Sequence, residues 1–170
     1  FKTVEIAFSI DDIAERFEYQ RTNATWNEVK ENINRFRELR ARLPNVIQLQ
    51  VCSTVNVYNV MYLEDLATWI DLQDFDFVYW NMLHEAYYLS VSTLPAKAKE
   101  VAISKLESAN VSKFHRQEFD KIVDFMNRGV EIDGNILRMK VEDLDWKRSH
   151  DLRTHHPELA EAIDYNGPQR

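Results

Sequence analysis

The sequence predicts an α/β protein with three parallel strands, arranged as part of a β/α barrel and followed by a helical extension. Strand and helix patterns alternate over residues 1–92, and two of the strands pair an apolar face with a polar one. Repeated β-α-β patterns with helical connections are typical of parallel strands joined by right-handed crossovers. We therefore expect a barrel-like part over residues 1–92 and a helical extension over residues 93–170, packed together as one compact domain.

Three segments have the pattern of strands. Residues 4–10 and 46–56 alternate between apolar side chains and small or polar ones, whereas residues 75–83 are almost all apolar, so their faces cannot be assigned. A doubly wound sheet has apolar faces on both sides, because helices cover both. A polar face on two successive strands instead favours helices outside and a polar lumen inside. Three strands cannot close a barrel, so this face lines an open half-barrel or faces structure outside the chain.

Helices are expected between and after the strands. The first begins at a capping box of Thr25 and Glu28, keeps one apolar stripe, and ends at Pro44. Residues 13–24 read as a polar connection, and residues 139–170 read as polar and broken. Helices are predicted at residues 25–44, 62–73, 94–108 and 112–129, with a short one after Pro157.

Charge and composition argue against several classes of protein. The net charge of −7 disfavours general nucleic-acid binding. The basic run of Arg35, Arg37, Arg40 and Arg42 shares its helix with several glutamates, so we interpret it as a solvated helix face. The three glycines are too few and too scattered for a phosphate-binding loop.

The single cysteine, Cys52, excludes an internal disulfide and any cluster held by several cysteines of this chain. It fits a reducing cytoplasm, which is the expected location. No apolar run approaches the roughly 20 residues that a membrane span needs, and no secretory pattern is present.

Polar residues gather where the three strands end. In parallel α/β architectures, ligands bind at the carboxyl ends of the strands. Each residue also has a simpler explanation: the aspartates as caps, Thr54 and Asn56 as turn formers, His84 as a partly buried histidine and Arg21 as a surface charge. Their coincidence at one sheet edge favours a binding site. The candidates are Ser9, Asp11, Asp12, Thr54, Asn56, Asn81 and His84, with Arg21 just downstream.

An ordered series of segments resembles the later part of radical S-adenosylmethionine enzymes, especially those with a truncated "twitch" C-terminal region. The series runs over most of the chain, and no single motif in it is highly specific. It comprises "VEIAFSIDD", "FEYQRTNATWNEVKENINRF", "VCSTVNVYNVMYLEDLATW", "LSVSTLPAKAKE", "LDWKRSHDL" and "PELAEAI". The resemblance implies a partial (β/α)6 barrel, of which residues 1–92 would be the C-terminal half, roughly its fourth to sixth strands. The chain would thus begin in mid-barrel, with the N-terminal half-barrel as its missing partner.

The resemblance also implies roles for the candidate residues. Ser9 and Asp11 match positions near the ribose and amino-acid parts of S-adenosylmethionine, and Arg21 matches an arginine near its carboxylate. Thr54 and Asn56 match lumen positions near cofactor or substrate. Asn81 and His84 remain candidates for the substrate side.

One departure from the family pattern is decisive for the chemistry. The family holds a [4Fe–4S] cluster with a C-x3-C-x2-C motif, which this chain lacks, so it would be inactive alone and the cluster would belong to the missing half. The substrate, a small molecule or peptide, is not revealed. If isolated, the chain is expected to form a homodimer through the edge of its first strand, which has little protection against strand pairing.

Two other functions stay open. One is a non-catalytic α/β binding or interaction protein, because a fold alone does not establish activity. The other is a metal-dependent hydrolase that uses the histidine-rich stretch "HDLRTHHPE", although its spacing matches no established zinc motif. That stretch contains His150, Asp151, His155, His156 and Glu158.

Overall fold

The computed structural model describes residues 2–168, and these divide into two compact units. The first, unit 1, comprises the described residues up to Thr54 together with Asp65–Asn81; the second, unit 2, comprises Val55–Glu64 and the described residues from Met82 onward. The chain is thus divided differently from the boundary expected at residue 92. Two connections that leave the strands belong with the C-terminal helices, and they bond to each other where the Val57 N–H donates to the Leu89 carbonyl at 3.0 Å.

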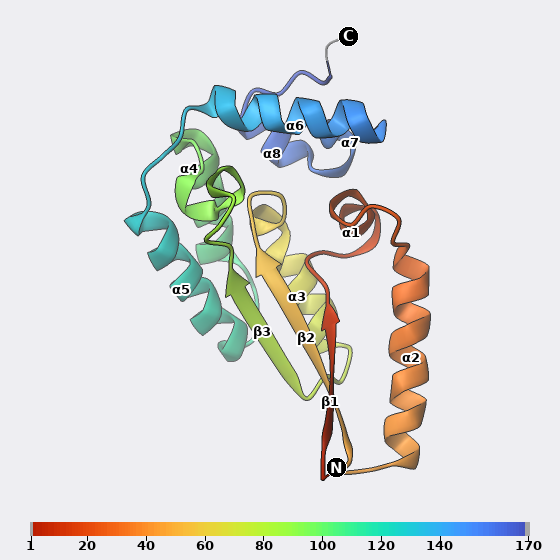
Figure 1. Cartoon of the computed structure of the whole chain (residues 1–170). Coiled ribbons are helices and arrows are strands. Elements are labelled where there is room, and N and C mark those ends of the chain that lie inside the picture. The colour runs from red at the N-terminus through yellow and green to blue at the C-terminus, as the bar shows by residue number, and fades with distance from the viewer. Residues whose placement is uncertain (1, 169–170) are drawn as a thin grey trace. The chain divides into compact units, whose positions relative to one another are not determined.

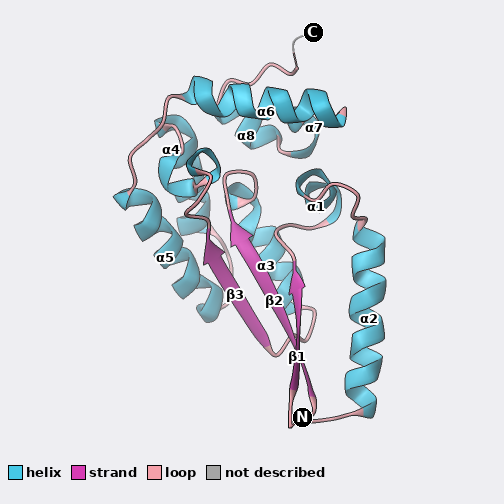
Figure 2. Cartoon of the chain, viewed as in Figure 1, coloured by secondary structure: helices cyan, strands magenta, loops and turns pink. Residues whose placement is uncertain are grey.

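Unit 1 is built on a three-stranded sheet in the order β1-β2-β3 (Figures 1 and 2). The strands are β1 (Val4–Ser9), β2 (Ile47–Val55) and β3 (Phe77–Met82). β1 and β2 pair in parallel, in a register that runs from Val4 opposite Ile47 to Ser9 opposite Cys52. The predicted α/β class with three parallel strands is confirmed, and β1 lies at one edge of the sheet, as its sequence position indicated.

Three helices belong wholly or mainly to unit 1. Helix α2 (Trp26–Arg42) begins as predicted, with the Thr25 hydroxyl accepting the Glu28 N–H at 3.4 Å, and α3 (Leu63–Asp71) follows β2. Helix α1 (Ala14–Gln20) was not predicted, because residues 13–24 were interpreted as a polar connection. It has no side-chain cap, and of its seven residues only Phe17 and Tyr19 are buried, so little in its sequence indicates a helix.

Helices α2 and α3 cover the same face of the sheet. Both crossovers step in one direction along the order β1-β2-β3, and right-handed crossovers then place their helices on one side. Aromatic side chains join the layers on that side: Phe8 of β1 meets Phe36 of α2 at 5.8 Å between ring centroids, and Trp26 of α2 meets Trp69 of α3 at 5.0 Å. This arrangement is wound in one direction, unlike a doubly wound sheet.

The opposite side of the sheet, here called the open face, carries polar and aromatic residues. Along β2 the residues on the helix side are buried, and those on the open face are half-buried. Along β1 and β3, the open-face residues are exposed. The open face consists of Glu5, Ala7, Ser9, Gln48, Gln50, Cys52, Thr54, Phe77, Tyr79 and Asn81.

Unit 2 is helical. Its elements are η1 (Val60–Tyr62), η2 (Tyr87–Leu89), η3 (Val91–Thr93), α4 (Ala96–Ser108), α5 (Lys113–Arg128), α6 (Gly134–Arg148), α7 (Leu152–His155) and α8 (Pro157–Ala162). The predicted helices α4, α5 and α8 are confirmed. None of the helices in the described part of the chain combines the length and the apolar character that a membrane crossing requires.

Helix α6 was not predicted, because most of it lies in the stretch interpreted as polar and broken. It is capped by Asp133, whose carboxylate accepts the Asn135 N–H at 2.9 Å, and it buries Leu137 and Val141, one turn apart. Near its end, the buried carboxylate of Asp145 accepts the Leu152 N–H and the Tyr165 hydroxyl, both at 2.8 Å. In the "LDWKRSHDL" segment, this aspartate therefore holds the C-terminal helices together.

Candidate ligand site at the carboxyl edge of the sheet

Asp11 is the centre of the carboxyl edge of the sheet. It lies two residues after the end of β1, and the whole residue is 8% exposed. One oxygen, Oδ1, accepts the backbone N–H of Thr54 at 2.8 Å, and the other, Oδ2, accepts Nε and Nη2 of Arg21 at 3.0 and 2.7 Å. The carboxylate thus fastens the end of β2 and the connection after α1 to the end of β1. Three of the residues predicted for the site are brought together here.

Arg21 presents a positive charge at this edge. It is the residue after α1, and its backbone N–H donates to the Phe17 carbonyl at 2.9 Å, which holds the start of its side chain in place. Its guanidinium lies 6.0 Å from the ring centroid of Phe17 and pairs with Asp11. The side chain is nevertheless 36% exposed, so the arginine is held in place by Asp11 and stays accessible from solvent.

Asp12, the next residue, is fully buried in a second ionic cluster. Its Oδ1 accepts the Ile13 N–H at 2.8 Å and Nε of Arg16 at 3.0 Å, and Nη2 of Arg16 reaches Asp65 of α3 at 2.8 Å. Burial raises the pKa of Asp12 from 3.8 to about 7, although the charge of Arg16 opposes this rise. The carboxyl edge therefore contains a carboxyl group that titrates near neutral pH. The arginine four residues after Asp12 was the signal for this cluster in the sequence.

The remaining candidates fall into two groups. Ser9 lies on the open face opposite Cys52, and Asn81 is exposed on the same face of β3. Both residues belong to unit 1, as Asp11 does. Asn56 and His84 belong to unit 2. The side chain of Asn56 accepts the Tyr58 N–H at 2.9 Å, which is the turn-forming role considered as its alternative, and the exposed ring of His84 packs on Phe125 at 5.0 Å.

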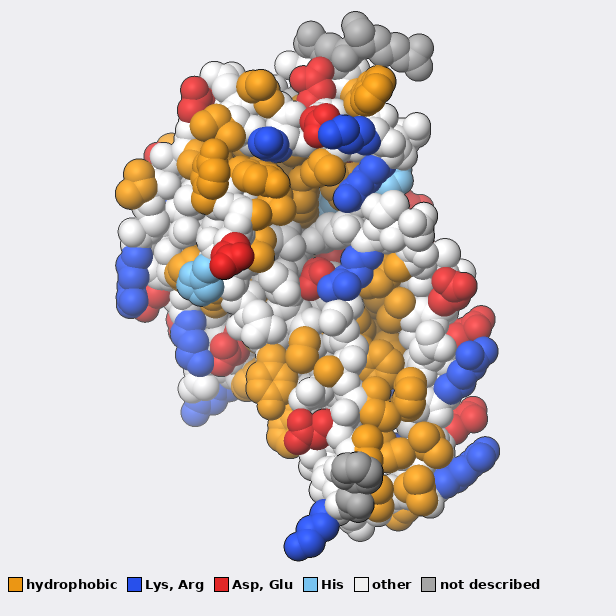
Figure 3. All heavy atoms as spheres, viewed as in Figure 1, with side chains coloured by type: hydrophobic (Ala, Val, Ile, Leu, Met, Phe, Trp, Pro, Cys, Tyr) orange, Lys and Arg blue, Asp and Glu red, His pale blue; other side chains and the backbone are white. Residues whose placement is uncertain are grey.

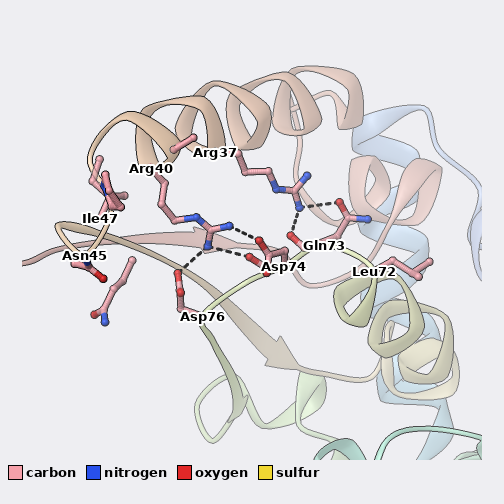
Figure 4. Close-up of a pocket in the computed structure, with 11 residues that line it drawn as sticks. Arg37, Arg40, Asn45, Ile47, Leu72, Gln73, Asp74 and Asp76 are labelled. Atoms are coloured by element: carbon pink, nitrogen blue, oxygen red, sulfur yellow. Dashed lines mark hydrogen bonds and ion pairs between the residues drawn. The ribbon is translucent and has the colours of Figure 1, made fainter.

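The opposite, amino end of the sheet holds a hollow of about 770 Å³ (Figure 4). Arg40 bridges Asp74 at 2.6 Å and Asp76 at 2.9 Å, and Arg37 donates to the carbonyl and the side chain of Gln73. Both arginines therefore hold the loop between α3 and β3, and their interpretation as part of a solvated helix face is wrong. Burial, with the nearby charge of Arg40, lowers the pKa of Arg37.

The histidine-rich stretch does not assemble a metal site. His156 is buried against the rings of Tyr58 and Tyr62, Glu158 pairs with Lys105, and Asp151 pairs with Arg153. Within residues 2–168, no group of three or more His, Cys, Asp and Glu side chains is placed to hold a metal ion. This arrangement gives the hydrolase hypothesis no support.

The residues of the chain fit one of the two groups that the family resemblance implies. Cys52, half-buried on the open face, cannot hold a [4Fe–4S] cluster alone, so the cluster does not fit this chain. The chemical groups at the carboxyl edge do suit the polar parts of S-adenosylmethionine. The Arg21 fork suits a carboxylate, and the hydroxyls of Ser9 and Thr54 suit ribose or amino groups.

Comparisons of the chain with protein-family models, with curated proteins and with solved structures found no match.

Proposed function

We propose that the chain is the C-terminal portion of a radical S-adenosylmethionine enzyme, in which the open face and the carboxyl edge line the cavity for cofactor and substrate. The observation that carries the proposal is the direction of winding. Three parallel strands in sequential order place α2 and α3 on one side and leave a polar face on the other. A β/α barrel is wound in this way, with its ligand at the carboxyl ends of the strands.

Each carboxyl-edge residue has a distinct task in this proposal. Arg21 binds the carboxylate of S-adenosylmethionine, and Asp11 keeps its guanidinium oriented while tying β1 to β2. Ser9 and Thr54 contact the polar groups of the cofactor from the neighbouring strand ends. When bound, S-adenosylmethionine supplies the hydrogen-abstracting chemistry, with its iron–sulfur cluster held outside this chain. The residues of this chain bind and orient the cofactor and the substrate, and they exclude water.

The outer edge of β1 is where the N-terminal half-barrel would pair. The N–H groups of Val4 and Ile10 point to β2, so those of the intervening Glu5, Ala7 and Ser9 point outward. Figure 3 shows hydrophobic side chains gathered between β1 and α2. Val4 of β1 is 40% exposed, Leu39 of α2 is 38% exposed, and Leu43, the residue after α2, is 44% exposed. A preceding β/α unit would cover both the edge and these side chains.

The test uses the complete gene product that contains these residues, purified without oxygen. We expect bound iron and sulfide, an electron paramagnetic resonance signal of the reduced cluster that changes when S-adenosylmethionine is added, and cleavage of that cofactor by reductant. The 170-residue chain alone is the control, and it should bind no cluster after reconstitution.

Two results would overturn the proposal. One is a complete gene product, alone or with its natural partner subunit, that contains no cluster and does not bind S-adenosylmethionine. That result would favour the non-catalytic binding protein. The other is stoichiometric iron and sulfide on the 170-residue chain itself, which would mean that the cluster site has been misplaced.

A further inference from the structure

Two aromatic side chains stand on the open face without a covering element. Phe77 and Tyr79 of β3 are 41% and 48% exposed, while Trp80 between Tyr79 and Asn81 is buried. In Figure 3, hydrophobic side chains gather over the β3 region of this face. Exposed rings on the sheet are costly unless something covers them, and rings on a flat sheet face are suitable platforms for stacking a planar ligand.

The open face has almost no net charge. Within unit 1, Glu5 is the one charged residue among the described residues of this face, and it lies toward the amino end of β1. At the carboxyl end, the charge of Asp11 is balanced by Arg21. A neutral surface of this kind repels neither an acid nor a base, and it offers no counter-ion to a charged ligand. An uncharged ligand matches it best.

The polar groups beside the aromatic rings are mainly amides. Gln48 and Gln50 project from β2, Asn81 projects from β3, and each side-chain amide has both a donor and an acceptor. Among the described residues, Oε1 of Gln50 is buried and has no hydrogen-bond partner, so this amide can turn toward the open face and accept from a ligand without breaking a hydrogen bond of Oε1. Such amides pair in bidentate fashion with the donor–acceptor edges of nucleobases.

We infer that the open face binds a nucleobase, and that the substrate of the proposed enzyme is an uncharged nucleoside or a similar base-bearing molecule. The base stacks on Tyr79 and Phe77, and its polar edge pairs with Gln50. This inference rests on the proposed function, because it takes the open face as the wall of a ligand cavity. It adds the chemical class of the substrate to that proposal.

A nucleobase could also come from S-adenosylmethionine, which contains adenine. The two sources share the stacking chemistry, but S-adenosylmethionine competes with a nucleoside only at a cofactor site. A separate substrate site still binds a nucleoside when the cofactor is saturating, whereas a cofactor site does not.

The first experiment titrates the 170-residue chain with adenosine, guanosine, cytidine and uridine by calorimetry. We expect at least one nucleoside to bind, and Tyr79→Ala and Phe77→Ala to weaken that binding about 5- to 100-fold each, the range expected for one stacked base. Tyr79→Phe keeps the ring and should bind within about 2-fold of the parent. The matched control is Tyr87→Ala in unit 2, because Tyr87 is 54% exposed but does not belong to the open face.

The outcomes separate this inference from the proposed function. No binding of any nucleoside, or binding that Tyr79→Ala and Phe77→Ala leave unchanged, overturns the inference, even where the complete gene product binds a cluster and S-adenosylmethionine. In the complete gene product, a nucleoside that still binds at saturating S-adenosylmethionine supports a substrate site. Full displacement by the cofactor overturns the substrate assignment.

Discussion

The two ends of the same sheet use arginines in different ways. At the amino end, Arg40 is 19% exposed as a side chain and bridges two carboxylates of one loop, so its charge is fully used within the protein. At the carboxyl end, Arg21 is 36% exposed and pairs with one carboxylate, Asp11, which itself bonds to the end of β2. The first arrangement closes a loop, whereas the second holds a cation where a ligand can reach it.

Under the proposed function, the comparison separates residues that stabilise the fold from residues that bind a ligand. Conserved chemistry at the carboxyl face of a β/α barrel is generally catalytic or ligand-binding, and the amino face generally serves stability. The difference between the two arginine sites follows the same division. It predicts that substitutions at the amino end change the free energy of unfolding, whereas Arg21 changes ligand affinity with little effect on unfolding.

The largest effect is expected at the carboxyl edge, from Asp12. Its pKa is about 7 in the folded chain and 3.8 in the unfolded one, so the folded chain holds a proton that the unfolded chain releases. The stability that this difference contributes is fully present below about pH 4 and is lost as the pH rises through about 7, a change of about 4 kcal/mol. Asp12→Asn keeps an acceptor for Arg16 but cannot titrate.

Urea unfolding at intervals between pH 4 and pH 8 measures this difference. We expect the stability of Asp12→Asn relative to the parent to increase from about pH 4 to about pH 7 and then to level off. Asp65→Asn is the matched control, because Asp65 pairs with the same Arg16 but its side chain is 56% exposed. A parallel pH dependence in the parent and in Asp12→Asn would show that Asp12 is ionised in the folded chain throughout.

The second prediction concerns the amino end. Oδ2 of Asp76 accepts the Leu49 N–H at 2.7 Å as well as Nη1 of Arg40, and Leu49 is fully buried. Asp76→Ala leaves that N–H without its side-chain acceptor and should lower the free energy of unfolding by about 1.5–3 kcal/mol. Asp74→Ala removes the other, exposed partner of Arg40 and should cost no more than about 1 kcal/mol. Equal losses in the two variants, measured by urea unfolding, would contradict this account.

The third prediction concerns Arg21 in the complete gene product. Arg21→Ala should weaken S-adenosylmethionine binding about 10- to 100-fold, because one charge-assisted hydrogen bond is worth about 1.5–3 kcal/mol. Asp11→Asn still offers an acceptor to Thr54 but loses the charge that orients Arg21, so a smaller loss of affinity is expected.

Arg35→Ala is the control for these affinities, because its side chain is 73% exposed and pairs with Glu31 at 3.7 Å. Arg37 is unsuitable as a control because it holds the α3–β3 loop. Unchanged affinity in both Arg21→Ala and Asp11→Asn, measured by calorimetry, would place the cofactor elsewhere.

The strands and helices that were predicted correctly were mostly recognised from local sequence patterns. β1 and β2 alternate strictly, so each was located to within about one residue, and α2 was recognised from its Thr25 cap. α1 and α6 were missed because their stability depends on tertiary burial: α1 has seven residues and no capping side chain, and α6 is rich in charged residues. The division into two units depends on contacts between distant segments, which no local pattern contains.

The candidate site was predictable to the extent that it depends on strand ends. Asp11, Arg21 and Thr54 meet because parallel strands end at one edge, a consequence of topology alone. The Asp12–Arg16 pair has a local spacing of four residues, but its link to Asp65 joins elements whose packing no sequence pattern indicates. The aromatic residues of the open face were not recognised because β3 has apolar residues on both faces, so only the structure distinguishes Tyr79 from its buried neighbour Trp80.

The smallest effect is expected at the outer edge of β1, where the proposed N-terminal half-barrel would pair. The backbone N–H and C=O groups of Glu5, Ala7 and Ser9 point outward, so β1 can pair antiparallel with β1 of a second copy, centred on Ala7. In this pairing Glu5 lies opposite Ser9, so no like charges meet. We expect the 170-residue chain to be a dimer by light scattering. Ala7→Pro removes an outward N–H and leaves the ladder to β2 intact, so it should weaken dimerisation about 5- to 30-fold, or about 1–2 kcal/mol. A chain that stays monomeric at high concentration would refute this pairing, and a complete gene product that dimerises as strongly as the isolated chain would show that no preceding strand covers the edge.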